Sequence, residues 1–213
     1  MEYENDNIEH KRSDYIKYID DNDFESFCQE EEFKSLTNLD LNNDAEIQKL
    51  HIGSIGDIGC KMIISACWFD SLIELDLSYN NIYNEGVQIL ANTAPKKLET
   101  LYLAGNKITD MGIKFIIDGE LIKSLKNLDL GNNYIADNGV ELLNDFSSNL
   151  ISLHLRYNFI SNKGIKFIAN MIKNNKSLIH LSLDYNEKIS ENAINNINEL
   201  LKINKTNCLP VSL

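Results

Sequence analysis

The sequence predicts a curved α/β solenoid with a parallel sheet on its concave side and helices on its convex side. Three observations lead to this prediction. A pattern of leucines, an asparagine and an isoleucine recurs at intervals of 25 to 28 residues. Each copy begins with alternating apolar and polar residues, as a strand does, and continues with apolar residues at helical spacing. Glycines stand just before four of the helical stretches. A repeat of this length indicates a stack of similar units rather than one globular core.

The repeat is clearest in five copies from Leu72 onward. The first copy aligns Leu72, Leu75, Leu77, Asn80 and Ile82 with equivalents in each later copy, and the fifth contains one inserted residue. The copies span residues 72–82, 98–108, 125–135, 150–160 and 178–189. Upstream, residues 36–41 and 47–52 look like degenerate copies. Chance does not produce five matches at one period.

The two halves of each unit predict one strand and one helix. The pair of leucines in LxL forms the inward side of a short strand. Apolar residues at i, i+3 and i+7, such as Ile165, Ile168 and Ile172, form the buried stripe of an amphipathic helix. One unit cannot bury both apolar faces alone, whereas stacked units can. Strands stack about 4.8 Å apart and helices are about 10 Å wide, so the helical side must fan out and the stack must curve.

The pattern LxxLxLxxNxI resembles the leucine-rich repeat family, and the period together with "DxGVxxL" is similar to its ribonuclease-inhibitor-type subclass. The resemblance covers residues 36–201, with five clear repeats and one or two degenerate ones. It implies that the side-chain amides of five asparagines bond the backbone of neighbouring turns as a buried ladder. These are Asn80, Asn106, Asn133, Asn158 and Asn186. Asp44 and Ile55 stand at the equivalent upstream places, so we expect the ladder to fail there.

Both ends of the stack need caps, because terminal units otherwise expose core and strand edges. Residues 1–46 contain 15 acidic and 4 basic side chains, a balance of −11 out of the total of −12. We predict an acidic tail and helical cap over residues 1–35; a separate partner-binding segment is the alternative. The last helix is expected to finish near Lys202, with residues 202–213 as a C-terminal cap or tail.

Composition excludes several classes of function. There is no basic stripe of the kind that nucleic-acid backbones require, so we expect no nucleic-acid partner. No apolar run is long enough for a membrane helix or a secretory signal, which predicts a cytoplasmic protein without membrane contact. The four cysteines lack zinc-ligand spacing. No catalytic set, phosphate loop, metal cluster or cofactor motif is present, so we expect neither enzyme activity nor a cofactor nor a metal.

The residues between and beside the inward leucines point to the concave side, and we predict that a protein partner binds there. Tyrosine and arginine are enriched at binding hot spots, and such side chains gather toward the C-terminal strands. The predicted contact residues are Tyr79, Tyr102, His154, Arg156, Tyr157, His180, Asp184 and Tyr185. An ion pair across the sheet between Arg156 and Asp184 is the structural alternative for two of them. His154 and His180 lack a third metal ligand and are better read as polar surface histidines.

The function that best fits is a non-catalytic protein–protein interaction module, expected to be monomeric, acting as an adaptor or effector. An effector delivered into a host cell is the alternative to a resident cytoplasmic protein. The second candidate is a regulator of a GTPase or of actin filaments, by resemblance to Ran GTPase-activating proteins or tropomodulin C-terminal domains. For the former, Arg156 is the only candidate for an arginine finger.

Overall fold

The computed structural model describes residues 28–29, 38–40, 55–67, 69–93, 95, 97–144 and 149–208. Most of the predicted N-terminal cap (residues 1–35), the degenerate copy at residues 47–52, Asp44 and the tail from residue 209 lie outside the described residues. The predictions for those segments therefore remain predictions.

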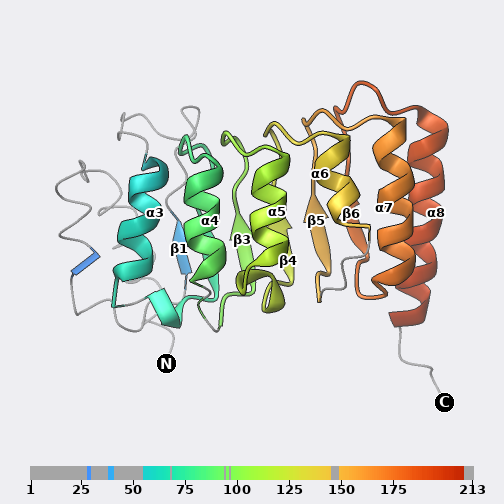
Figure 1. The fold of residues 1–213 in the computed structure, drawn as a ribbon. Helices are drawn as coiled ribbons and strands as arrows, with labels where there is room; N and C mark the ends of the chain where they lie inside the picture. Colours follow the sequence, from blue (N-terminus) through green and yellow to red (C-terminus); the bar gives the residue numbers. More distant parts are fainter. Residues whose placement is uncertain are drawn as a thin grey trace, which may run out of the picture.

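Six short parallel strands form one sheet whose spatial order is their order in the chain (Figure 1). The strands are β1 (Asn38–Asp40), β2 (Glu74–Asp76), β3 (Thr100–Tyr102), β4 (Asn127–Asp129), β5 (Ser152–His154) and β6 (His180–Ser182). The middle leucine of each strand pairs with the middle leucine of the next strand. The sequence period therefore sets the register from β2 to β6, and the predicted solenoid is confirmed. At β1 the register departs from the period, because Leu39, 36 residues before Leu75, takes the place beside it that the repeat alignment gives to Leu50.

Helices cover one side of this sheet, each following the strand of its own repeat (Figure 1). They are α3 (Gly56–Ser65), α4 (Asn84–Asn92), α5 (Asp110–Asp118), α6 (Asp137–Leu142), α7 (Asn162–Asn174) and α8 (Glu191–Cys208). Two short turns of 3₁₀-helix, Phe69–Ser71 and Leu121–Lys123, lie on the way back to β2 and β4. The predicted stripe is buried: Ile165, Ile168 and Ile172 of α7 are 6% exposed or less. Helix stripes and strand leucines together make one continuous apolar core.

The asparagine ladder joins each repeat to the one before it. Asn106 illustrates the pattern: its side-chain Nδ2 donates to the carbonyl of Leu77 in the preceding repeat at 3.0 Å and to that of Leu103 in its own. Its Oδ1 accepts from the backbone N–H groups of Asn80 and Ile82, each at 3.0 Å. These backbone groups are buried, so without the amide they would have no partner.

The other members of the ladder are equally enclosed. Asn80, Asn106, Asn133, Asn158 and Asn186 are all 6% exposed or less. Within the described residues the ladder begins at Asn80, whose Oδ1 accepts the N–H of Ile55 at 3.4 Å. Ile55 stands where a ladder asparagine would stand, and it has no amide with which to continue the pattern.

A second ladder, not predicted from the sequence, joins the starts of the helices. In α3 to α7 the first or second residue is Asp or Asn, and its Oδ1 accepts the N–H of the residue that precedes the next helix. Asp110 accepts from Ala136 at 2.7 Å, and Asp137 accepts from Ser161 at 2.8 Å. The members are Asp57, Asn84, Asp110, Asp137 and Asn162. We call them the helix-start ladder.

The helix-start ladder explains the glycines at the head of the helices. A Cβ built on Gly164 would lie 2.5 Å from Oδ1 of Asp137, and one on Gly139 would lie 2.5 Å from Oδ1 of Asp110. The Gly164 N–H also donates to Asp137 at 3.0 Å. Glycine is therefore needed because the acceptor of the preceding repeat occupies the space of a side chain. The signal in the sequence was an Asp or Asn two residues before each glycine.

The last helix differs from its prediction. α8 continues to Cys208 instead of finishing near Lys202. Asn204 lies in this extension and is 2% exposed. Its Nδ2 donates to the carbonyls of Ile172, Asn175 and Leu178, at 2.9 to 3.1 Å. The extension persists because this one amide satisfies three carbonyls at the end of α7 and the turn after it.

Replacing Asn133 by Ala should lower the free energy of unfolding by about 1–3 kcal/mol, because buried backbone groups lose their partners. Chemical denaturation measures the change. The matched control is Asn138→Ala, an exposed asparagine of the same repeat. Equal effects of the two substitutions would contradict the ladder at this position.

Asp137 should contribute stability that depends on pH. Partial burial raises the pKa of its carboxyl, but hydrogen bonds from Ser161 and Gly164 outweigh this effect and hold the pKa below its usual value. A lowered folded-state pKa adds stability above the unfolded pKa, and this is lost as the pH falls through the folded pKa. Asp137→Ala should cost about 1–2 kcal/mol at pH 7.

The comparison for this prediction is Asp137→Asn, because Asn84 and Asn162 serve in the same ladder. The asparagine variant should keep most of the stability while losing the pH dependence that Asp137 adds. Urea denaturation between pH 7 and pH 3 tests both points. If the free energy of unfolding of Asp137→Asn changes with pH as that of the wild type does, Asp137 does not have this role.

Candidate functional site

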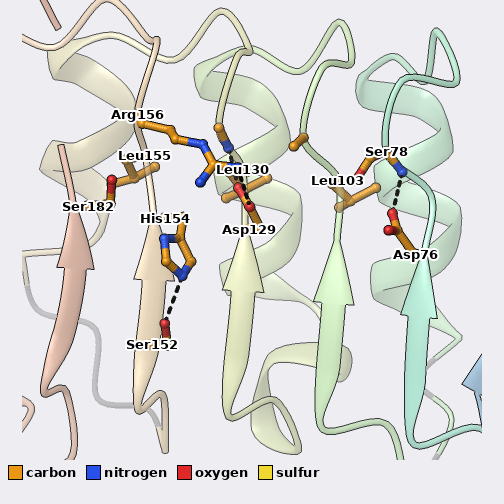
Figure 2. Close-up of polar contacts among 12 residues, drawn as sticks. Asp76, Ser78, Leu103, Asp129, Leu130, Ser152, His154, Leu155, Arg156 and Ser182 are labelled. Carbon is orange, nitrogen blue, oxygen red and sulfur yellow. Dashed lines mark hydrogen bonds and ion pairs between the residues drawn. The ribbon is translucent and has the colours of Figure 1, made fainter. Parts of the chain in front are cut away.

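The concave face is formed by the outward side chains of the strands and by the residue two positions after each strand. Pairing aligns them in rows, so that Asp76, Tyr102, Asp129, His154 and Ser182 are successive neighbours across the sheet. Figure 2 shows this face, with the ion pair and hydrogen bonds that hold several of its side chains. The predicted residues Tyr102, His154, Arg156, His180 and Asp184 all lie on it.

Arg156 bonds a different carboxylate from the one predicted. Its Nη2 lies 3.2 Å from Oδ2 of Asp129 on the N-terminal side (Figure 2), instead of pairing with Asp184. Glycine at position 131 permits this, since a Cβ there would lie 2.9 Å from Cγ of Arg156. Asp184 instead accepts from the Ser182 hydroxyl at 3.0 Å. The carboxylate of Asp129 is only 9% exposed, whereas Arg156 is 43% exposed and remains open to a partner.

Tyr102 lies among carboxylates. Burial, then the negative charges of Glu74, Asp76 and Asp129, raise the pKa of its phenol above the usual value. The three acids come from β2 and β4, on both sides of the strand that carries Tyr102. This half of the concave face therefore presents the half-buried ring of Tyr102 surrounded by carboxylates. An aromatic ring next to negative charge is a favourable site for a cation.

The two histidines do not form a joint site. Nε2 of His154 lies 3.0 Å from the hydroxyl of Ser152 on its own strand (Figure 2). Its Nδ1 is buried and has no hydrogen-bond partner among the described residues. His180 is exposed on the neighbouring strand. Among the described residues, no group of three or more His, Cys, Asp or Glu side chains is arranged to hold a metal ion.

Tyr79, Tyr157 and Tyr185 lie beside the concave face rather than within it. All three have positive φ, between 53° and 61°, at the point where the chain leaves the sheet. The rings of Tyr157 and Tyr185 stack, with centroids 4.1 Å apart. Desolvation and the hydroxyl of Tyr185 raise the pKa of Tyr157. Tyr79 lies over Gly105, where a Cβ would come within 2.3 Å of the ring.

These tyrosines belong to a larger surface, the loop edge, made by the segments that run from each strand into the first turn of the next helix. It carries eight of the twelve large apolar side chains that are exposed among the described residues: Ile58, Tyr79, Tyr83, Met111, Tyr134, Tyr157, Phe159 and Tyr185. Five of them were not predicted. Tyr134 stacks on Phe159 at 5.9 Å, and the ammonium of Lys107 lies 5.5 Å from the Tyr134 ring centroid. Aromatics one place after the ladder asparagine in two successive repeats were the available signal.

Comparison with known proteins agrees with this geometry. A family model described as "Leucine Rich repeat" matches residues 71–91, 94–116, 122–143 and 146–169. The chain is a leucine-rich repeat protein. Mouse "NACHT, LRR and PYD domains-containing protein 14" is 32% identical over 164 residues, covering 72% of this chain and 16% of the relative. The human protein of that name matches equally, over 15% of its length. The chain thus spans less than a fifth of these relatives.

Solved structures of leucine-rich repeat type are also similar. A "tropomodulin C-terminal domain" from Caenorhabditis elegans has a TM-score of 0.47 and 16% identity, covering 89% of this chain and 95% of that one. "Leiomodin-1 Actin-Binding Site 2 (ABS2)" has a TM-score of 0.45 and 17% identity, covering 83% and 87%. Likeness at this level carries no argument about function.

The matched repeats and relatives show no catalytic domain over the shared residues. No helix in the described part of the chain is long and apolar enough to cross a bilayer.

The pair between Arg156 and Asp129 should be energetically coupled, because one partner is nearly buried. Arg156→Ala leaves that carboxylate without its cation, and a double-mutant cycle with Asp129→Asn should give a coupling of about 1–3 kcal/mol. The reference is the exposed pair of Lys202 and Glu199, each 69% exposed, for which we expect under about 0.5 kcal/mol. Equal coupling in the two cycles would refute the difference.

Proposed function

We propose that this leucine-rich repeat chain is a non-catalytic binding module that holds a protein partner on its concave face and loop edge. The partner would place a lysine- or arginine-rich segment over β2–β4 and its hydrogen-bonding groups over β5 and β6. The contact residues are those predicted from the sequence, with Tyr134 and Phe159 of the loop edge added.

The observation that carries this proposal is the segregation of charge. The outward positions of β2–β6 and the residue two places after each strand contain four carboxylates and one arginine, a net charge of −3. The carboxylates are Glu74, Asp76, Asp129 and Asp184. No lysine occupies these positions, although lysine is the common base of this chain. Potential of one sign over a recessed surface attracts and orients a partner of the opposite sign.

The aromatic residues favour a protein over a small molecule. Tyrosine and arginine are over-represented where protein partners bind tightly. The stack of Tyr157 on Tyr185 is already assembled, so binding would order few further side chains. Six strands about 4.8 Å apart form a shallow surface roughly 25 Å across. Such a surface fits a helix or loop of another protein, whereas small-molecule sites are enclosed.

The GTPase-regulator alternative gains no support. An arginine finger must reach into the active site of another protein, but the guanidinium of Arg156 is held against Asp129 within the concave face. A cytoplasmic location, or delivery into a host cell as an effector, remains part of the proposal and rests on sequence composition.

The test is capture of the partner by the full chain and by a variant with a changed binding face. The variant combines Arg156→Gln, Tyr157→Asn and Tyr185→Asn. Asparagine is chosen because Asn132 occupies the equivalent position of another repeat with φ 52°, so the fold should tolerate it. We expect affinity for the captured partner to fall at least about tenfold, and binding of the wild type to weaken as salt increases.

The matched control is Lys166→Gln with Lys173→Gln, two exposed positions on α7. It should bind as the wild type does. Thermal unfolding of all three proteins separates loss of the surface from loss of the fold. Unchanged binding by the triple variant would move the contact elsewhere, and salt-independent binding would remove the basic segment from the proposal.

A further inference from the structure

We propose a second, separate binding site at the free edge of β6. It would take an extended segment of another protein as a seventh parallel strand, with apolar side chains at alternate positions and a carboxylate nearby. This site uses backbone groups at the β6 edge, and it shares with the concave-face proposal only Tyr185, through its N–H rather than its ring.

Each internal edge of the sheet offers the same set of backbone groups to the next strand. At the β3 edge, the N–H groups of Leu103 and Gly105 donate to β4 and the residue two places after it, at 2.8 and 2.9 Å, and the Glu99 carbonyl accepts two N–H groups. At the β5 edge the equivalent donors are Leu155 and Tyr157, at 2.8 and 2.9 Å. This set of hydrogen bonds is the one that a strand makes with a parallel neighbouring strand.

The same groups are open on β6. By equivalence they are the N–H groups of Leu183 and Tyr185 and the carbonyl of Ile179. In the part of the chain that the structure describes, none of the three has a hydrogen-bond partner. A strand edge with free donors and acceptors in fixed register is a template for another strand.

The apolar layer is open at the same place. The middle leucines of β2–β5 are 3% exposed or less, whereas Leu181 of β6 is only partly buried. A cavity of about 420 Å³ lies between β6 and α8, lined among others by Ile179, Leu181 and Leu201. The inward side chains of a next strand would occupy this position, and the volume lies within the range of binding pockets, about 300–1,000 Å³.

The charges of the cavity rim indicate what the segment carries. Lys202 pairs with Glu199 at 2.6 Å, and Lys205 adds a further positive charge, so these three residues sum to +1. A carboxylate on the incoming segment would complement this charge. Two copies of this edge would instead bring two positive rims together, so we assign the site to a different chain.

The probe is a peptide copied from a segment that already pairs with a strand edge in the folded chain. Residues 124–133 contain β4, which in the folded chain adds to β3 in the required register. A synthetic copy with glutamate in place of Lys126 supplies the carboxylates. With the full chain near saturation, we expect the amides of Leu183 and Tyr185 to exchange with deuterium at least about tenfold more slowly, while that of Gly105 stays unchanged.

Two N-methylated peptides provide the matched control. In the fold, the N–H of Asn127 donates to the β3 side and that of Leu130 donates to the β5 side. Methylation at Asn127 should weaken binding about tenfold or more, whereas methylation at Leu130 should have little effect. In the protein, Lys205→Glu should weaken binding, and Tyr102→Ala on the concave face should not.

Several results would overturn the proposal. No slowing of exchange with peptide up to about 1 mM, or equal binding of the two methylated peptides, would refute an added strand. Binding that appears only after removal of residues 209–213 would show that the chain's own terminus is the occupant. A dimer in sedimentation that the peptide dissociates would assign the edge to a second copy. None of these results bears on the concave-face proposal.

Discussion

The structure depends on one constraint: every coil of the solenoid buries backbone groups that its own strand and helix cannot satisfy. The ladder amides meet this requirement, since each offers two donor hydrogens and an acceptor in the dry interior. Asn106, for example, bonds its own turn and the turn before it. No apolar side chain of similar size can do so, and a charged one would cost far more to bury. The leucines supply the bulk of the burial, but the asparagines fix how one coil lies on the next.

The helix-start ladder complements this link on the other side of each repeat. The asparagine ladder bonds each repeat to the one before it, while residues such as Asp137 accept from the one that follows. Two sets of bonds at different points of the coil prevent neighbouring repeats from rotating about a single contact. The glycines at the helix heads belong to the same arrangement, because the ladder oxygen fills the space of their side chains. The concave face carries neither ladder, and its side chains are held only by an ion pair and by short-range bonds such as that from the Ser78 N–H to Asp76, among those the structure describes.

The surfaces differ in chemistry in a way that a single partner does not explain. The concave face is acidic around Tyr102, the loop edge is aromatic, and the open end beside α8 is slightly basic with an unfilled strand edge. A repeat protein gains such variety because each unit contributes the same positions with different residues. The acidic and aromatic surfaces adjoin and fit one partner that is basic and rich in hydrogen-bonding groups. The strand edge fits a different, extended segment.

The sequence by itself determined the solenoid, its register from β2 to β6 and the identity of the buried asparagines, because these follow from a period and an alternation that local chemistry enforces. The pairing of β1 with β2 does not follow the period, and only the structure showed it. It also placed Tyr102, His154, Arg156, His180 and Asp184 on the concave face. Only the tertiary structure decided that Arg156 turns toward Asp129, since this depends on the space left by a glycine one strand away. It likewise revealed the helix-start ladder, the aromatic loop edge and the open edge of β6. The ladder and the loop edge arise between repeats, where residues some 25 positions apart meet, and periodicity reports which positions are equivalent but not what their side chains contact.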